Sequence, residues 1–373
     1  MQTMSTVGTD IKFMKTAIRL GQQGRGFTEP NPLVGAVVVR NNRLISTGCH
    51  RAFGGEHAER TALRNVSAAG ATLYVPLEPC SHYGKQPPCD EFIIEKGVKR
   101  VVISTQDPCP LVNGRGIKKL RKNGIRVDEG CLEEMYWRIN RHYFKYISRK
   151  SPYVTLRAGV SIDGKLTDRY RNSRWVTDAR LRDYSHSLRG EFSAILVGKA
   201  TVLADDPQLT IREDAWKGKG LTRVVLDSGN SLPPGLRIFK EQENFPTMIF
   251  STKAGEKKGK KGGGHFFVDA DADGSGVNLN QVLAILGWHG IASLLVEGGG
   301  EVIGSFLQRE LYDEIILFTA HKLLGGRDSV QLFSSGKKIA EALVLAEPEI
   351  LTFDSGCIVR GFRAPASHGP GGW

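Results

Sequence analysis

The chain has 373 residues, of which 40% are hydrophobic and 24% are charged, a composition typical of globular proteins rather than disordered or fibrous ones. No apolar run is long enough to span a membrane, and six cysteines are too few for a disulfide-rich scaffold. The first residues lack the apolar core of a signal peptide, so we expect a cytoplasmic protein.

Positive charge is concentrated in the first part of the chain. Residues 1–150 hold 24 Lys and Arg and 13 Asp and Glu, a net charge of +11, whereas residues 151–373 carry a net charge of only +1. This asymmetry and the length predict two domains with these bounds. A basic domain attracts either nucleic acid or a small phosphorylated substrate, and charge alone leaves both open.

Helices and strands alternate in the first half. Ile11, Met14 and Ile18 recur at helical spacing, and Val37, Val38 and Val39 indicate a buried strand. The patterns predict helices over 10–21, 56–65, 90–96, 113–123 and 131–143, and strands over 33–40, 71–78 and 100–104. This alternation indicates an α/β layer fold.

The polar stretch 145–152 is the predicted domain boundary, and a second α/β set follows it. Its predicted strands are 153–161, 194–198, 223–227, 247–251, 293–297 and 314–319, and its predicted helices are 178–189, 280–287 and 300–308. A β-hairpin over 349–362 is expected to turn at Asp354-Ser355-Gly356, and residues 364–373 are expected to fray. The lysine- and glycine-rich stretch 252–265 is interpreted as a solvated surface loop.

The strongest chemical signal is His57-Ala58-Glu59 followed by Pro79-Cys80 and Cys89. One imidazole and two thiolates give a zinc ion three protein ligands and leave its fourth position to water, as catalysis requires. Zinc-dependent nucleobase deaminases carry this pattern, in which the glutamate moves protons between water, ring nitrogen and departing amine. Glu59 is therefore the predicted catalytic residue. The alternative interpretations of the whole motif are a structural zinc site or cysteines unrelated to any metal.

Several longer motifs carry a resemblance to one family. They are Pro30-Asn31-Pro32-Leu33-Val34-Gly35, Gly48-Cys49-His50, Glu78-Pro79-Cys80-Ser81-His82-Tyr83-Gly84 and Pro87-Pro88-Cys89. Because of these motifs and the wide spacing of the two cysteines, the chain resembles the bifunctional riboflavin-biosynthesis deaminase–reductases. The resemblance extends from about Ile11 to Phe362. The resemblance implies a cytidine-deaminase-like three-layer α/β/α domain followed by a dihydrofolate-reductase-like α/β domain.

The same resemblance implies roles for single residues of the first domain. Zinc is held by His57, Cys80 and Cys89, and the substrate pocket is lined by Asn31, His50, His82 and Lys85. One position departs from the family pattern, because Asp107-Pro108-Cys109-Pro110 has a cysteine where the family usually has asparagine.

In the second half, Val296-Glu297-Gly298-Gly299-Gly300 joins a predicted strand to a predicted helix, although no Gly-x-Gly-x-x-Gly fingerprint is found. Taken alone, this turn fits phosphate binding and simple close packing equally well. The resemblance implies that NADPH is bound by Gly159, Trp175, Thr201, Asp205, Ser228, Gly299, Gly300, Glu301, Val302, Ile303, Gly304 and Ser305. It implies substrate contacts from Ser173, Arg189, Leu209, Arg212 and Glu297. Arg157 is a second departure, because the family commonly has lysine there.

The predicted function is two successive reactions on one phosphorylated pyrimidine. The resemblance implies zinc-dependent deamination of 2,5-diamino-6-ribosylamino-4(3H)-pyrimidinone 5′-phosphate, then NADPH-dependent reduction of its ribosyl group to ribityl phosphate. We expect a homo-oligomer that binds a small molecule and neither nucleic acid nor membrane. The rival functions are a nucleic-acid base deaminase with a C-terminal binding module, and a zinc-binding scaffold without catalytic activity.

Overall fold

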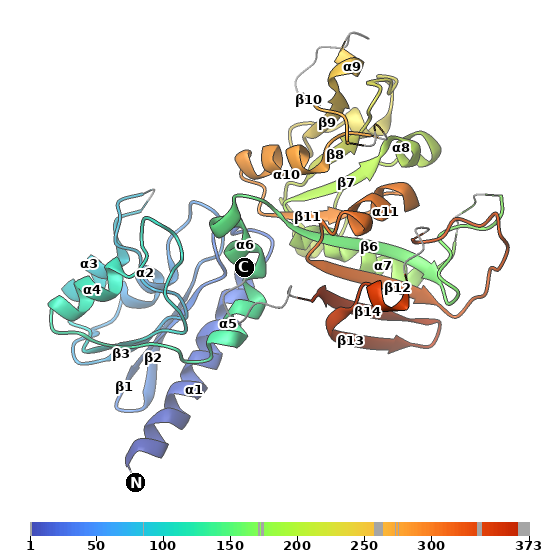
Figure 1. Cartoon of the computed structure of the whole chain (residues 1–373). Helices are drawn as coiled ribbons and strands as arrows, with labels where there is room; N and C mark the ends of the chain where they lie inside the picture. Colours follow the sequence, from blue (N-terminus) through green and yellow to red (C-terminus); the bar gives the residue numbers. More distant parts are fainter. Residues whose placement is uncertain are drawn as a thin grey trace. The chain divides into compact units, whose positions relative to one another are not determined.

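The computed structural model describes residues 2–84, 86–170, 172, 175–256, 264–272, 274, 276–333 and 338–364. It divides into two compact units, Met1–Arg149 and Lys150–Trp373, each built on one β-sheet (Figure 1). No helix in these ranges is both long and apolar enough to cross a membrane.

The N-terminal unit has a five-stranded sheet in the order β2-β1-β3-β4-β5. Its strands are β1 (Gly35–Arg40), β2 (Arg43–Cys49), β3 (Thr72–Tyr74), β4 (Arg100–Val102) and β5 (Arg126–Asp128). Its helices are α1 (Gln2–Gly21), α2 (Ala58–Leu63), α3 (Cys89–Glu95), α4 (Arg115–Lys122), α5 (Glu133–Ile139) and α6 (Arg141–Arg149), with a 3-10 turn at Gln22–Gly24. β1 is antiparallel to β2 and β3, whereas β3, β4 and β5 are parallel.

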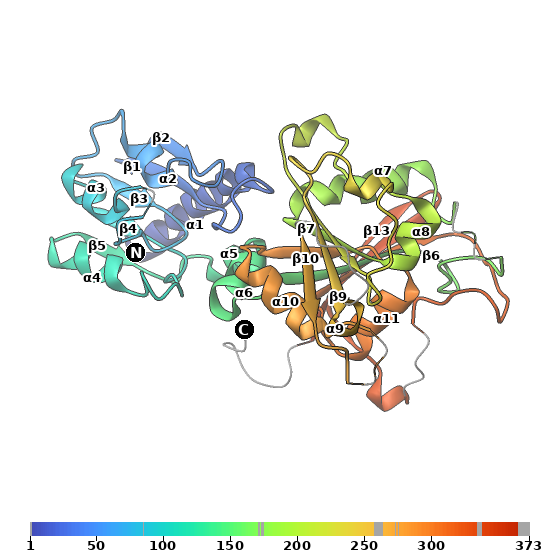
Figure 2. The ribbon, with the colours of Figure 1, turned by 90° about the horizontal axis from the view of Figure 1, so that it is seen from above.

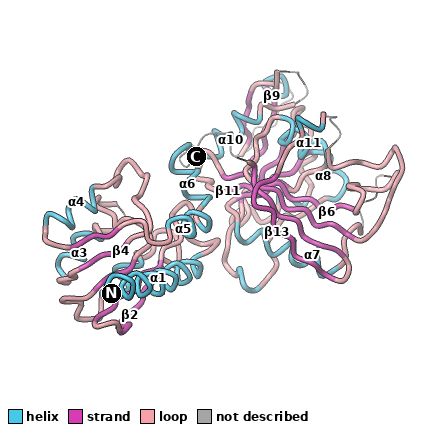
Figure 3. Tube along the Cα trace, turned by 60° about the horizontal axis from the view of Figure 1, so that its bottom comes forward, coloured by secondary structure: helices cyan, strands magenta, loops and turns pink. Residues whose placement is uncertain are grey.

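Helices cover both faces of this sheet. Gly35 pairs with Cys49 and Gly48 pairs with Ala36, so the two glycines point to opposite faces. A Cβ at Gly35 would lie 2.2 Å from Ala17 O of α1, and a Cβ at Gly48 would lie 2.1 Å from Ala58 O of α2. The two glycines therefore let α1 and α2 pack directly on the sheet from opposite sides; Figure 3 shows α1 alongside β2.

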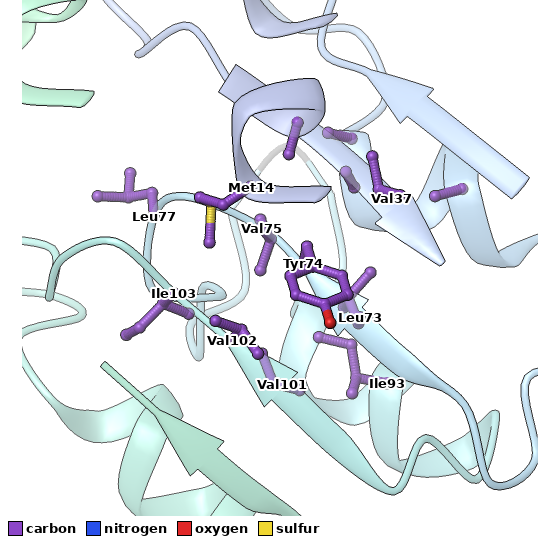
Figure 4. Packing of buried hydrophobic residues seen from close by; sticks show 14 of the residues in the cluster. Met14, Val37, Leu73, Tyr74, Val75, Leu77, Ile93, Val101, Val102 and Ile103 are labelled. Atoms are coloured by element: carbon purple, nitrogen blue, oxygen red, sulfur yellow. The ribbon is translucent and has the colours of Figure 1, made fainter. Parts of the chain in front are cut away.

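The core of this unit lies between α1 and the central strands. Figure 4 shows Met14 of α1 close to Val75, Tyr74 and Leu77, with Val101, Val102 and Ile103 below them. All of these side chains are buried. The all-apolar pattern of β1, which sequence reading recognised, follows from its position in the middle of a sheet covered on both faces.

The predicted helix over 131–143 is wrong in one respect: the structure breaks it into α5 and α6 at Asn140. The Asn140 backbone leaves the helical conformation, with φ −114°. Its side-chain Oδ1 accepts a hydrogen bond from Leu33 N at 2.7 Å, and its Nδ2 donates to Leu33 O at 3.3 Å. These two buried bonds satisfy backbone groups of a loop and offset the helical bonds lost at the break.

Other boundaries also differ from the sequence-based expectation. The stretch 145–152, predicted as the domain boundary, contains the end of α6, which continues to Arg149. The strand predicted over 71–78 ends at Tyr74, and Leu77 makes only an isolated bridge to Thr105. β2 and β5 were not predicted, because neither has the run of apolar residues that marks β1.

The C-terminal unit has a nine-stranded sheet in the order β10-β9-β8-β7-β11-β6-β12-β14-β13. Figure 2 shows this sheet from above, with β6, β7, β9, β10 and β13 labelled. Its strands are β6 (Tyr153–Ser161), β7 (Ala194–Gly198), β8 (Thr222–Leu226), β9 (Thr247–Thr252), β10 (His265–Val268), β11 (Ser293–Val296), β12 (Glu314–Ala320), β13 (Leu345–Phe353) and β14 (Gly356–Arg363). Its helices are α7 (Ala179–Ser187), α8 (Lys199–Asp205), α9 (Lys253–Glu256), α10 (Leu279–Trp288) and α11 (Gly300–Gln308), with 3-10 turns at Leu188–Glu191, Asp214–Trp216, Arg237–Phe239 and Ile339–Glu341.

The strands from β10 to β12 are parallel, so the loops that follow them meet at one edge of the sheet. The predicted C-terminal hairpin is confirmed as β13 and β14, which turn at Asp354 and Ser355, although β13 begins earlier, at Leu345. β10 was not predicted. Of the lysine- and glycine-rich stretch, residues 257–263 lie outside the described residues, as do residues 365–373 of the tail.

Candidate functional site

Three predicted metal ligands meet in the N-terminal unit. His57 immediately precedes α2, Cys80 lies in the loop after β3, and Cys89 is the first residue of α3. His57 Nδ1 lies 3.3 Å from Cys89 Sγ and 3.5 Å from Cys80 Sγ. The ligand atoms all lie within 4.8 Å of one another. Among the described residues, these three side chains form the one group that could hold a metal ion.

The donor set fits zinc. Two sulfurs and one imidazole nitrogen are the ligands that zinc prefers, and three protein ligands leave one tetrahedral position open. Hydrogen bonds from Cys89 and His57 lower the pKa of the Cys80 thiol, which favours the thiolate that a metal needs. The hydrogen bond to Cys80 raises the pKa of His57 to about 9.

Glu59 lies in the first turn of α2, two residues after His57, and its side chain is buried. Burial raises its pKa above the ordinary value, because a charged carboxylate is poorly solvated there. The structure thus places a buried carboxyl group with a raised pKa beside the group of metal ligands.

A cavity of about 270 Å³ opens at this group. Its lining includes His57, Glu59 and Cys80, and also three residues predicted to contact substrate, Asn31, His50 and His82. The fourth, Lys85, lies outside the described residues. The structure therefore brings six of the predicted site residues of this domain to one cavity.

Two of these polar residues hold each other in place. Asn31 Nδ2 lies 3.2 Å from His50 Nε2, and His50 Nδ1 lies 3.0 Å from Glu56 O. If the Asn31 amide donates to Nε2, then Nδ1–H donates to the carbonyl, which is the neutral form of the ring. Burial lowers the pKa of His50, which favours the same neutral form.

Sequence reasoning gave no role to several lining residues: Phe53, Gln86, Asp107 and Val112. The last two belong to the loop between β4 and α4, and Cys109 of the same loop lines the cavity as well. Tyr143 of α6 donates a 2.6 Å hydrogen bond to Asp107 Oδ1, which also accepts from Cys109 N. No local sequence signal links this loop to the zinc motif.

Glu78, next to Pro79-Cys80, holds that loop against the metal site. Its buried carboxylate accepts hydrogen bonds from Asp107 N at 3.2 Å, Gly114 N at 2.8 Å and Ile117 N at 3.2 Å. Two of these donors belong to the first turn of α4, which has no capping side chain of its own. The position of Glu78 next to Pro79-Cys80 was the available sequence signal for this role, but the sequence analysis assigned Glu78 no role.

We expect Glu78→Ala to lower the free energy of unfolding of the N-terminal unit by about 1–3 kcal/mol, because it leaves buried N–H groups without an acceptor. Urea unfolding followed by circular dichroism measures the change. Glu129→Ala is the matched control, since this half-exposed carboxylate binds only the exposed Arg121 in the contacts described. Equal unfolding midpoints for the two variants would contradict this role of Glu78.

In the C-terminal unit, Glu297 follows β11 and lies between two arginines. Arg189 donates to it through Nε at 3.0 Å and Nη2 at 2.8 Å, and Arg157 Nη1 lies 3.5 Å away. Burial alone would raise the pKa of Glu297, but the charges of Arg189 and Arg157 lower it to about 2. Glu297 is therefore a carboxylate held in place by ion pairs at neutral pH.

The predicted cofactor residues gather at the carboxyl edge of the parallel strands. Gly299 N donates to Thr201 Oγ1 at 3.2 Å, which joins the glycine turn before α11 to α8. A Cβ at Gly198 would lie 2.7 Å from Val302 Cγ2, so this turn packs closely on the end of β7. Gly159 lies near the end of β6, and Ser228 follows β8 at the same edge.

The other predicted residues of this domain differ in their exposure to solvent. Trp175 and Arg212 are exposed, whereas Leu209 is buried with a positive φ of 50°. Burial lowers the pKa of the half-buried His186, and among the neighbouring charges Arg189 lowers it most, whereas Arg212 makes only a smaller contribution. Ser173 lies outside the described residues.

Comparison with known proteins gives the same two-part division. The model of the cytidine and deoxycytidylate deaminase zinc-binding region matches residues 7–105, and that of the RibD C-terminal domain matches residues 152–359. These matches confirm the predicted fold class of an N-terminal cytidine-deaminase-like part and a C-terminal reductase part.

Relatives match over most of their length. Riboflavin biosynthesis protein RibD of Aquifex aeolicus is 41% identical over 320 residues, covering 85% of this chain and 88% of that protein. The Escherichia coli protein of the same name is 37% identical over 341 residues, 85% of this chain and 89% of that protein.

Solved structures agree with the sequence comparisons. The diaminohydroxyphosphoribosylaminopyrimidine deaminase/5-amino-6-(5-phosphoribosylamino)uracil reductase of Thermotoga maritima is 36% identical, with a TM-score of 0.84 over 96% of this chain and 100% of that chain. Acinetobacter baumannii RibD, form 1, is 30% identical, with a TM-score of 0.85 over 96% and 99%.

Proposed function

The chain belongs to the RibD family of riboflavin biosynthesis proteins, and on this premise we propose that it catalyses two successive steps. Residues 1–150 remove an amino group from 2,5-diamino-6-ribosylamino-4(3H)-pyrimidinone 5′-phosphate by hydrolysis. Residues 151–373 then reduce the ribosyl group to ribityl phosphate with NADPH. The observation that carries the proposal is that His57, Cys80 and Cys89 come together, and that His57 and Cys80 line the same cavity as Glu59.

For deamination, we assign the metal site to His57, Cys80 and Cys89. A zinc ion held there supplies Lewis acidity, which brings the pKa of a water towards neutrality. Glu59 takes a proton from the water whose oxygen bonds to the ring carbon, and delivers it to the ring nitrogen. It then passes the second proton of that oxygen to the amino group, which leaves as ammonia while the carbonyl forms. Asn31 and His50, fixed by their mutual contact, orient the pyrimidine in the cavity, together with His82 and Lys85.

For reduction, bound NADPH supplies the hydride, and this chain positions the reactants. The segment Gly299–Ser305 comprises the residue before α11 and the amino-terminal part of that helix, where backbone N–H groups favour phosphate. Gly159, Trp175, Thr201, Asp205 and Ser228 complete the proposed cofactor site.

Glu297 accepts hydrogen bonds from sugar hydroxyls of the substrate in this proposal. Arg189 keeps it ionised and oriented, since Nε and Nη2 of Arg189 are bound to Glu297 and its Nη1 is bound to Thr210 O. The exposed Arg212 suits a contact with the substrate phosphate. Ser173 and Leu209 are assigned further contacts with the substrate.

We also propose that the partner is a free nucleotide rather than nucleic acid, and that the protein works in the cytoplasm as a homo-oligomer. The size of the cavity supports a single base as ligand. All six cysteines are free thiols, which is typical of a reducing compartment. The oligomer rests on the resemblance to the family.

The test incubates purified protein with the diaminopyrimidine nucleotide, with and without NADPH, and follows ammonia and NADPH together. We expect ammonia in both cases, and NADPH oxidation only where deaminated product is present. Removal of zinc with a chelator should stop ammonia release and leave reduction of supplied deaminated product intact. NADPH oxidation without ammonia would overturn the order of steps, and neither signal would overturn the proposed function.

A further inference from the structure

Two segments of the C-terminal unit run side by side beyond the ends of β6 and β12. They are residues 161–167 and 320–332, called here the paired arm, and both loops extend together past the sheet in Figure 1. Ile162 N donates to Lys322 O at 2.9 Å, and Leu166 N donates to Val330 O at 2.8 Å. Leu332 N donates back to Gly164 O at 3.1 Å, so bonds between the segments run along the whole arm.

Asp163 joins the two segments of the paired arm. Its carboxylate accepts hydrogen bonds from Leu324 N at 3.1 Å and Gly325 N at 2.8 Å on the opposite segment. It also accepts from Ser161 Oγ at 2.6 Å within its own segment. These three bonds, of which the bond from Ser161 has the largest effect, lower the pKa of Asp163 to about 2. The Asp163 carboxylate is therefore ionised at neutral pH.

The paired arm also packs on Gly300, the first residue of α11. A Cβ at Gly300 would lie 3.0 Å from Gln331 O, 3.0 Å from Val330 Cγ1 and 3.1 Å from Leu166 Cδ1. Both segments of the arm therefore contact the first residue of the helix whose amino end is the proposed phosphate site. The position of the arm and the position of the glycine turn before α11 depend on each other.

Two further contacts connect the paired arm to the proposed cofactor site. Lys322 Nζ donates to Trp175 O at 3.0 Å. Gly159 lies in β6 only two residues before the arm begins at Ser161. The arm thus borders Gly159, Trp175 and Gly300, three positions that lie far apart in the sequence.

We propose that Asp163 is a positioning residue for NADPH: by joining the two segments, it holds the paired arm against the glycine turn and preforms one wall of the cofactor site. This inference rests on the proposed function, because it takes NADPH as the ligand of that site. Preforming a site lowers the ordering entropy lost on binding, so the effect of Asp163 falls on affinity rather than on the hydride step.

The test compares Asp163→Asn with the wild-type full-length protein. The amide replaces one oxygen by an NH2 group, which cannot accept and which faces a backbone N–H or a hydroxyl. We expect the Kd and KM for NADPH to rise about tenfold, with kcat at saturating NADPH within about twofold of wild type. Ser161→Ala removes only one of the bonds to Asp163 and should raise Kd less, by about threefold.

The matched control is Glu310→Gln, which removes a carboxylate bound to Arg363 at the opposite end of β12. It should leave NADPH affinity unchanged, and ammonia release should be the same in all variants. Unchanged NADPH affinity in Asp163→Asn and Ser161→Ala would overturn the proposal, as would an equal loss in Glu310→Gln. If Asp163→Asn does not fold, the Kd of Ser161→Ala for NADPH decides between the proposal and its rejection. A wild-type protein that binds no NADPH would instead overturn the proposed function.

Discussion

Glu59→Gln is expected to lower the rate of ammonia release by about three orders of magnitude, while zinc content and NADPH oxidation persist. Glutamine has nearly the shape of glutamate but cannot take or return a proton. The Glu59 carboxyl is buried and its pKa is raised, so it is suited to proton transfer rather than to surface charge. The variant should therefore keep the metal site and lose the chemistry.

Ammonia release, bound zinc and reduction of supplied deaminated product are measured on one preparation. Glu56→Gln is the control, because Glu56 lies three residues away and its side chain pairs with Arg64 and Thr61 instead. Near-normal ammonia release from Glu59→Gln would remove its catalytic assignment. Loss of zinc together with activity would instead indicate a role in building the site.

The second large effect is expected from Glu297→Leu. This variant leaves Arg189 and Arg157 without their carboxylate in a buried site, and removal of one partner of such an ion pair lowers the free energy of unfolding by about 3–5 kcal/mol. NADPH oxidation should be lost with it, whereas ammonia release should be retained. Urea unfolding monitored by tryptophan fluorescence detects the change, since Trp175, Trp216 and Trp288 belong to this unit.

The pH dependence gives a separate test of the same ion pairs. The pKa of Glu297 is about 2 in the folded chain, against an ordinary value of 4.5. A lowered carboxyl pKa contributes stability that is complete above about pH 4.5 and is lost as the pH falls towards about 2. The difference in unfolding free energy between wild type and Glu297→Leu should therefore shrink over this window. A control at the exposed Glu349 should show no such change, and a difference independent of pH would contradict the assignment.

The metal site could be predicted from sequence because its information is local. His57 and Glu59 are two residues apart, and each cysteine follows a proline, so residue type and spacing alone point to the candidate ligands. Glu78 and Asp107 were missed because their contacts connect a loop to backbone groups up to 39 residues away. No periodicity records such a contact.

The same reasoning explains the other differences between expectation and structure. Glu297 was predicted only as a substrate contact, whereas its ion pairs with Arg157 and Arg189 join positions more than 100 residues apart. The apolar pattern over 131–143 correctly predicted helix on both sides of Asn140. It could not reveal the break, because the bonding partner, Leu33, is 107 residues away.

The pairing of Asn140 with Leu33 bears on the modularity of the chain. The deaminase family model ends at residue 105, yet Asn140 secures the loop that carries Asn31, and Tyr143 secures Asp107. Both walls of the cavity are thus anchored by the segment that follows the last strand of the first sheet. The smallest portion of this protein that could be excised as a working deaminase therefore extends into α6, well past the residues that the deaminase family model matches.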